Sequence, residues 1–180
     1  MKKLFLGVLV FYVILGCSSA KRTIADNHPI HSLVSSKSYQ FNAHWANPMV
    51  TQSLTSIANS GLIQPGSNIS RINLAGNSNY IKLAGDRISA ILPYFGERQI
   101  GGGYGTSSGI EFNGIPADYQ QVFDTKSSTY SINFTIKDNT EQYFVRMMIF
   151  PSKSTTVSVS STNRNSIRYD GEIVEIDKNL

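Results

Sequence analysis

Side chains of low and high polarity alternate with a period of two along much of the chain after residue 37. The alternation is clearest at 39–45, 130–136 and 155–160, where the less polar residue occupies every second position. In a β-strand, successive side chains point to opposite faces, so this pattern predicts strands with one face on a core and the other in water. We therefore expect an all-β fold built on a single antiparallel sheet.

Turn signals separate these segments at short intervals, and strands joined by tight turns pair most easily. The spacing predicts about ten strands in an up-and-down order, forming a curved half-barrel or a flattened barrel or sandwich. At most one short helix is expected, at 50–59, and Gly171 is a candidate break in the last strand. The predicted strands are 37–46, 69–74, 79–84, 87–92, 109–113, 118–124, 129–137, 142–150, 154–161 and 165–176.

One strand departs from the alternation. Residues 143–150 (YFVRMMIF) are apolar on both faces except at Arg146. This pattern predicts a strand covered on both faces, either by its place in the centre of the sheet or by the segment that precedes the domain.

The first residues have the pattern of an export signal. Lys2 and Lys3 precede the 13 apolar residues 4–16, and the only cysteine, Cys17, follows. A helix of that length reaches about 20 Å, short of the roughly 30 Å hydrocarbon core, so a signal peptide is favoured over a spanning helix. The end of this segment, Ile14-Leu15-Gly16-Cys17, resembles the lipobox of bacterial lipoproteins. The resemblance implies cleavage before Cys17 and acyl chains on its sulfur and new amino group, which anchor the chain in a membrane.

The chain thus divides into a signal peptide (1–16), a lipidated cysteine with a flexible tether (17–36), a β domain (37–176) and a tail (177–180). The tether is predicted because residues 18–36 have no helical or strand period. Lipoproteins that the Bacteroidetes export to the cell surface often carry acidic residues after the cysteine, whereas here the residues are neutral to basic. We therefore expect an outer-membrane protein whose domain faces the periplasm.

Composition narrows the possible partners. The 180 residues include one Cys and three His. A single cysteine excludes a scaffold of disulfides, and so few Cys and His residues make a metal site unexpected, so no metal or cofactor is expected. The net charge of +4 falls to +2 without the two signal-peptide lysines. The remaining basic residues are scattered, so no nucleic acid is expected as a partner.

Two parts of the chain resemble a known family. Residues 92–96 (LPYFG), the glycine-rich 101–105 and 109–112 (GIEF) are similar to the signature of a Bacteroidetes family of lipoproteins, the domain of unknown function 4251. Residues 157–171 agree, while 49–66 is longer than the usual connection. The resemblance implies an all-β lipoprotein domain and assigns no activity or catalytic residue.

Aromatic residues are the candidate ligand contacts, because they combine a large apolar area with a polar edge. We select Trp45, Tyr94, Phe95 and Tyr104. The last three flank a glycine run, and the spacing of these glycines is not that of a phosphate-binding loop. The alternative, which we favour for Tyr94 and Phe95, is that they plug an open end of the sheet.

Arg146 and Arg164 are the charges expected to be partly buried, and a buried guanidinium needs acceptors. Glu111 and Asp86 are the partners we expect first. A structural ion pair is favoured over a site for an acidic ligand, because arginine is rarely buried unpaired.

No catalytic residue is assigned. His28 and His31 lie in the predicted tether, where ordering two imidazoles around a metal ion costs entropy, and His44 is expected to be a solvated edge residue. Four carboxylates remain as candidates for a hydrolytic pair, although their spacing does not favour one: Glu97, Glu111, Asp118 and Asp124.

We therefore predict a non-enzymatic, lipid-anchored envelope protein. Its expected partner is a hydrophobic or amphiphilic small molecule, or another envelope protein, held against the concave side of the sheet. The alternatives are a hydrolase of envelope or dietary polysaccharide that uses two carboxylates, and a scaffold that joins an outer-membrane complex through its sheet edge.

Overall fold

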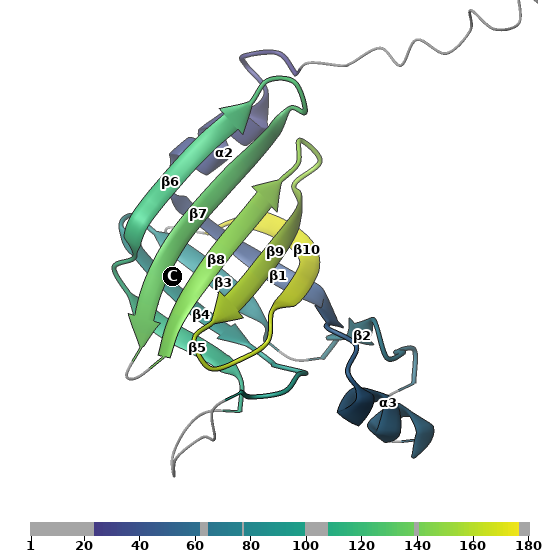
Figure 1. Cartoon of the computed structure of the whole chain (residues 1–180). Coiled ribbons are helices and arrows are strands. Elements are labelled where there is room, and N and C mark those ends of the chain that lie inside the picture. Colours follow the sequence, from purple (N-terminus) through teal and green to yellow (C-terminus); the bar gives the residue numbers. More distant parts are fainter. Residues whose placement is uncertain (1–23, 62–64, 77, 100–107, 139–140, 177–180) are drawn as a thin grey trace, which may run out of the picture.

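In the part of the chain that the structure describes, the fold is one ten-stranded antiparallel sheet with two short helices (Figure 1). This computed structural model describes residues 24–61, 65–76, 78–99, 108–138 and 141–176. The all-β class is confirmed. The strands are β1 (Ser38–Pro48), β2 (Ile72–Asn73), β3 (Tyr80–Ala84), β4 (Arg87–Leu92), β5 (Ile110–Gly114), β6 (Ala117–Asp124), β7 (Thr129–Asp138), β8 (Glu141–Ile149), β9 (Ser154–Ser161) and β10 (Ile167–Glu175). No helix in these ranges has the length and apolar character needed to cross a membrane.

The strand order is β5-β4-β3-β1-β10-β9-β8-β7-β6, and β2 pairs with β1 outside this path. From β3 to β5 and from β6 to β10, each strand pairs with the next along the chain, as an up-and-down order predicts. The exception is β1, which lies between β3 and β10 and so joins the two meanders. No local pattern indicates this pairing, because it connects the two ends of the domain.

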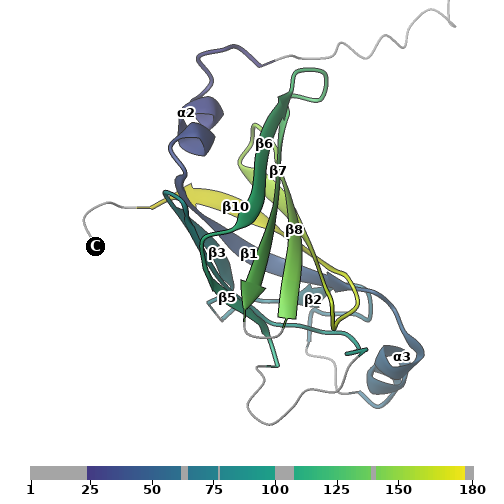
Figure 2. The same cartoon turned by 60° about the vertical axis from the view of Figure 1, so that its left-hand side comes forward.

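The sheet curls into a half-barrel, and its two walls face each other across the core (Figure 2). Only Ile115 and Pro116 separate β5 from β6, which do not pair. Instead β5 packs on β7, where the ring centroids of Phe112 and Phe134 lie 6.3 Å apart. The inner face therefore carries one continuous hydrophobic core.

Burial alternates along the strands as the period of two predicts. In β7, Ile132, Phe134 and Ile136 are buried and their neighbours are less so. β8 alternates as well, which corrects the expectation that this strand is covered on both faces. Phe144 and Met148 are 45% and 41% exposed, because the outer face of a single-layered wall meets solvent whatever residues it carries.

A second helix, α2 (Pro29–Ser35), corrects the prediction of a flexible tether up to residue 36. The Nδ1 atom of His28 caps its first turn by accepting a hydrogen bond from the Ile30 amide, and Pro29 occupies the first helical position. Ile30, Leu33 and Val34 then share one face at helical spacing and are buried in the core. The helix thus belongs to the folded domain.

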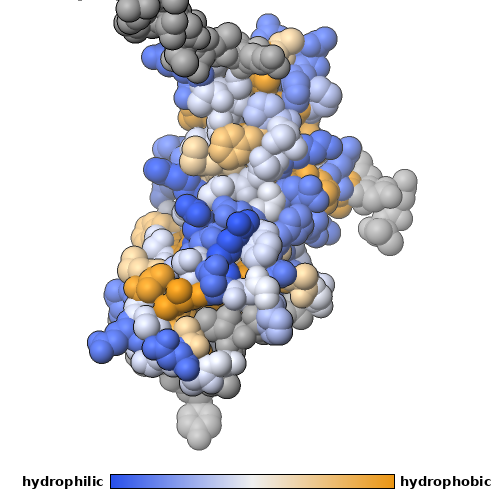
Figure 3. Space-filling view, turned by 90° about the vertical axis from the view of Figure 1, so that its right-hand side faces the viewer, coloured by the Kyte–Doolittle hydropathy of each residue, from blue (hydrophilic) through white to orange (hydrophobic). Residues whose placement is uncertain are grey.

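The helix expected at 50–59 is present as α3 (Gln52–Asn59), at the other end of the sheet from α2 (Figure 1). Thr51 caps it by accepting from the Leu54 amide. The segment leading into α3 exposes Met49 and Val50, at 54% and 52%. On the face drawn in Figure 3, hydrophilic surface surrounds a compact hydrophobic patch in the lower half of the molecule.

β10 runs through Gly171 without a break. Gly171 faces Ala43 of β1, next to the bulge between Ala43 and Trp45. A Cβ atom on Gly171 would collide with the Asn42 carbonyl oxygen and stand 3.0 Å from a ring carbon of Phe41. Glycine is therefore needed for the close approach of the two strands, not for a turn.

Candidate functional site

A hollow opens on the outer surface where β1 changes its pairing partner. β1 pairs with β3 along its first residues and with β2 near its end. Between the two, the Ala43 amide donates to the Asn79 carbonyl and the Leu74 amide donates to the His44 carbonyl, both at 2.9 Å. The bulge before Trp45 falls at this point, so the sheet is locally open and side chains of β1 face a depression.

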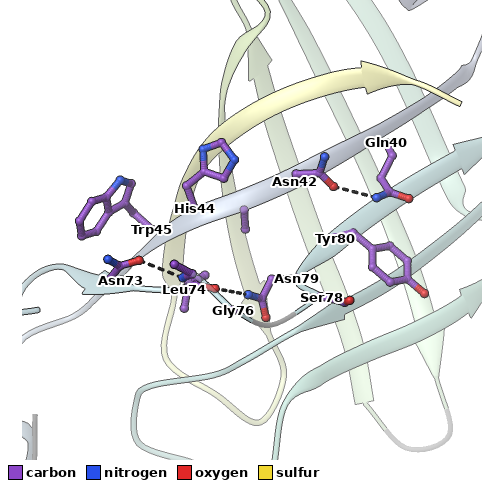
Figure 4. A pocket seen from close by; sticks show the side chains of 12 residues that line it. Gln40, Asn42, His44, Trp45, Asn73, Leu74, Gly76, Ser78, Asn79 and Tyr80 are labelled. Atoms are coloured by element: carbon purple, nitrogen blue, oxygen red, sulfur yellow. Dashed lines mark hydrogen bonds between the residues drawn. The ribbon is translucent and has the colours of Figure 1, made fainter. Parts of the chain in front are cut away.

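The hollow has a volume of about 630 Å³, within the roughly 300–1,000 Å³ range of small-molecule sites. In Figure 4, Trp45 and Tyr80 stand at opposite sides of the group, with His44 and several carboxamides between them. None of the twelve described lining residues is Asp, Glu, Lys or Arg. They are Gln40, Asn42, Ala43, His44, Trp45, Asn73, Leu74, Ala75, Gly76, Ser78, Asn79 and Tyr80.

The carboxamides are held in place by short local bonds. Buried Asn79 donates from Nδ2 to the Leu74 carbonyl at 2.9 Å, and Gln40 donates from Nε2 to Oδ1 of Asn42 at 2.7 Å. Gln40 and Asn42 each carry two N–H donors and one acceptor oxygen, which is more than the bond between them uses. The hollow therefore offers donors and acceptors together, a combination that suits hydroxyl groups.

Trp45, one of the four aromatic candidates, lies in this hollow. The guanidinium carbon of Arg71 stands 4.3 Å from the Trp45 ring centroid, a cation–π contact that fixes the indole and covers part of one face. Nε2 of His44 lies 4.0 Å from a carboxylate oxygen of Glu172. The sequence identified Trp45 by residue type, but the amides around it come from β1 and from residues 73–79, which meet only in the folded sheet.

The other aromatic candidates are placed elsewhere. Tyr94 donates its hydroxyl to the carbonyls of Asn165 and Glu97, both at 3.0 Å, and Phe95 packs against the core. Neither lines the Trp45 hollow. Tyr94 packs against the core as well, and a plug at an open end of the sheet stays a prediction. Tyr104 lies outside the described residues.

Arg164 forms a buried ion pair with Glu141, a carboxylate that the sequence reasoning missed. Arg164 is 4% exposed. Its Nε and Nη2 atoms donate to Oε1 and Oε2 of Glu141 at 2.9 and 3.2 Å, and the Ser161 hydroxyl donates to Oε1 at 2.6 Å. Arg98 adds a longer contact of 3.7 Å to Oε2. Glu141 stands two residues before Tyr143, so the two side chains face the same, inner side of the strand. This spacing is the feature of the sequence that could have indicated a buried carboxylate.

Asp86, one of the two expected ion-pair partners, contacts a lysine instead. Asp86 stands 3.4 Å from Nζ of Lys37, and Glu111 is exposed on β5. Arg146 is exposed as well, with its Nε atom donating to Oδ1 of Asn133 at 2.9 Å. Of the two arginines, only Arg164 is buried and paired with a carboxylate in the described residues.

The Arg164–Glu141 ion pair affects the pKa values of Glu141 itself and of the neighbouring Tyr143. Burial alone would raise the pKa of Glu141, but hydrogen bonds from Ser161 and Arg164 and the arginine charge hold it below its ordinary value. Burial and the neighbouring Glu141 carboxylate raise the pKa of Tyr143 to about 12. The arrangement keeps a carboxylate ionised inside the protein, a structural role rather than that of a proton donor.

The two histidines near the N-terminus serve α2. His28 caps the helix, and Nδ1 of His31 lies 2.8 Å from the Tyr130 hydroxyl, with its ring 4.9 Å from that of Phe123. The described residues contain no group of three side chains placed to hold a metal ion.

Comparison with known proteins agrees with the fold. The family described as Domain of unknown function (DUF4251) matches residues 22–173. The chain is also similar to a crystal structure of a DUF4251 family protein from Bacteroides eggerthii, with a TM-score of 0.54 and 12% identity over 81% of this chain and 84% of that one. No curated protein matches the chain.

The protein is thus a curled antiparallel half-barrel with a buried Arg–Glu pair. The chain belongs to the DUF4251 family, as the resemblance of residues 92–112 and 157–171 led us to expect.

Proposed function

We propose that this protein is a non-enzymatic binding protein of the cell envelope, and that its ligand is a small, uncharged, polar molecule of the saccharide class. The observation that carries the proposal is the hollow beside Trp45. An aromatic wall and several carboxamides surround it, and no charged residue stands among its described lining residues. Aromatic rings stack on the apolar face of a sugar ring, while carboxamides pair with its hydroxyl groups.

This ligand class is more polar than the hydrophobic or amphiphilic molecule that the sequence suggested. The inner, concave face of the sheet is occupied by core side chains, among them Tyr39, Phe41 and Tyr169, each 0% exposed. The outer hollow is polar instead, which favours a ligand with many hydroxyl groups.

Titration calorimetry of the full-length protein in detergent with neutral mono- and oligosaccharides tests the proposal. Loss of a stacking wall weakens binding by about tenfold or more, so we expect that effect from Trp45→Ala and from Tyr80→Ala. Phe150→Ala, which removes an exposed aromatic ring that lines neither this hollow nor the second one described below, is the matched control. Equal affinity of the Trp45→Ala variant and the parent would contradict the assigned site.

The same proposal includes an acyl anchor on Cys17 that holds the domain at the outer membrane, facing the periplasm. Its support is the lipobox-like sequence, and residues 1–23 lie outside the described part. Because α2 belongs to the domain, residues 18–23 alone separate Cys17 from Ile24, a reach of about 25 Å at most. Labelling with radioactive palmitate should mark the parent protein and not Cys17→Ser, which should also leave the membrane fraction.

A hydrolase that uses Asp118 and Asp124 as its carboxylate pair has less support. Asp118 and Asp124 stand near opposite ends of β6, about 20 Å apart at 3.3 Å per residue, while catalytic pairs in glycosidases are roughly 5–10 Å apart. The scaffold alternative has one favourable observation. β5 and β6 end the sheet, and Val122 on β6 is 58% exposed. Cross-linking through a cysteine introduced at Val122 tests whether an envelope protein adds a strand there.

A further inference from the structure

A second hollow lies on the outer face of the wall formed by β6, β7, β8 and β9. Its volume is about 510 Å³. In Figure 1 this wall stands in front of β1 and β3, so the second hollow and the Trp45 hollow are on opposite walls of the half-barrel. Strand register places its side chains in two rows across neighbouring strands.

The first row is centred on Arg146. Asn133 is its partner on β7 and Ser158 its partner on β9, while Gln120 on β6 faces Asn133. Arg146 is exposed, and its Nε atom donates to Oδ1 of Asn133 at 2.9 Å. This bond orients the guanidinium and directs the two Nη groups away from the bonded edge.

Arg146 forms no ion pair with a carboxylate in the described residues, unlike Arg98, Arg164 and Arg168. An oriented guanidinium beside hydroxyl and carboxamide groups is the arrangement that binds a carboxylate through two parallel hydrogen bonds. The sequence had already marked this arginine as a possible contact for an acidic ligand.

The second row adds an apolar surface. Phe144, 45% exposed, stands between Thr135 on β7 and Ser160 on β9. An aromatic ring flanked by hydroxyl groups suits the apolar face and hydroxyl edges of a sugar ring. Asp118 lines the β6 side of the hollow, two strands from Arg146 and so about 10 Å across the sheet. A carboxylate at that end of the hollow is an acceptor for hydroxyl groups of a ligand.

We propose that this second hollow binds an acidic saccharide, with Arg146 holding the carboxylate of a uronic acid unit and Phe144 supporting its ring. The proposal concerns a site separate from the Trp45 hollow, and it stands or falls independently of the neutral ligand proposed there. Binding energy from a charged pair at an exposed site is screened by salt, so affinity should fall as ionic strength rises.

The test is titration of the full-length protein in detergent with trigalacturonate and with its methyl ester. The acid should bind, and the ester, which has the same ring shape without the charge, should bind about tenfold more weakly or not at all. Arg146→Gln and Phe144→Ala should each weaken binding of the acid by about tenfold. Trp45→Ala should leave this binding unchanged, which separates the present proposal from the one for the neutral ligand.

Arg87→Gln is the matched control. Arg87 is exposed on β4 and its Nε atom donates to Oδ1 of Asn113 at 2.8 Å, the same local pair outside this hollow. The proposal is overturned if trigalacturonate does not bind at millimolar concentration, or if Arg146→Gln affects it no more than Arg87→Gln does. Equal binding of hippurate, a carboxylate without hydroxyl groups, would also overturn it by showing that the saccharide ring is not recognised.

Discussion

The guanidinium of Arg164 donates two hydrogen bonds, of 2.9 and 3.2 Å, to the carboxylate of Glu141, which lies 23 residues earlier in the chain. Only 3% and 10% of their side-chain surfaces are exposed. The pair fixes the loop before β10 against the first residue of β8, and Arg164 also donates from Nη1 to the Ser108 carbonyl at 3.0 Å. The Tyr94 ring lies beside the pair, with its centroid 5.1 Å from the guanidinium carbon of Arg164.

Removing one partner of this pair should destabilise the protein strongly. Arg164→Met leaves the Glu141 carboxylate buried without its counter-charge, a change that costs about 3–5 kcal/mol in comparable pairs. We expect urea denaturation to show a loss of that order. The double variant Arg164→Met/Glu141→Gln should recover part of the loss, because it no longer buries an unpaired charge.

Lys37→Met provides the comparison for an exposed pair. Lys37 lies 3.4 Å from Asp86, and 40% and 84% of the two side chains are exposed. Such pairs contribute about 0–1 kcal/mol. Equal losses for Lys37→Met and Arg164→Met would contradict a structural role for the buried pair.

Acid should weaken the folded state partly through Glu141. Burial alone would raise its pKa, but Ser161 and Arg164 lower it below the ordinary value of 4.5. The stabilisation is therefore complete above about pH 4.5 and is lost as the pH falls toward the folded-state pKa. Glu141→Gln should show a shallower decline in unfolding free energy below that pH, measured by urea denaturation at a series of pH values. A parallel decline in both proteins would show that Glu141 does not contribute.

Gly171→Ala tests the close approach of β1 and β10. The added methyl group meets the Asn42 carbonyl oxygen, so the strands must separate, at a cost of about 1–3 kcal/mol. Gly85→Asn is the control, since Gly85 has a φ of +65° and no atom within 4 Å of an added Cβ, and asparagine tolerates that conformation. Thermal unfolding should separate the variants, and an unchanged midpoint for Gly171→Ala would contradict the packing.

α2 should contribute to stability as part of the core. Leu33→Ala removes a buried side chain and should cost about 2–5 kcal/mol in urea denaturation. Ser32→Ala changes an exposed position of the same helix and should have little effect. Equal stability of Leu33→Ala and the parent would mean that the segment behaves as the tether first expected.

The strands were predictable because each one meets solvent on one face and the core on the other. Apolar and polar residues therefore alternate along the sequences of β1, β7 and β9. That reasoning failed for β8, where Phe144 and Met148 are apolar and yet face outward. It also missed α2, since Ile30, Leu33 and Val34 form too short a pattern to stand out beside the proline. Only their burial against the sheet shows why they are apolar.

The candidate site was predictable only in part. Trp45 could be selected by residue type, but its neighbours Asn73 and Asn79 come from a different segment, which reaches β1 only in the folded sheet. The partner of Arg164 was unpredictable for a similar reason. Glu141 is one of several carboxylates, and only the completed sheet brings it next to the arginine.

The pairing of β1 with β10 sets an order of events during synthesis. A nascent chain that ends before residue 167 lacks the strand that fills the centre of the sheet, so one long edge of β1 has no hydrogen-bonding neighbour. Cooperative folding must therefore await almost the entire polypeptide, and contacts between such distant segments form slowly. Truncated products should be captured by chaperones or proteases. In the finished chain, β1 and β10 pair along their lengths and complete the sheet.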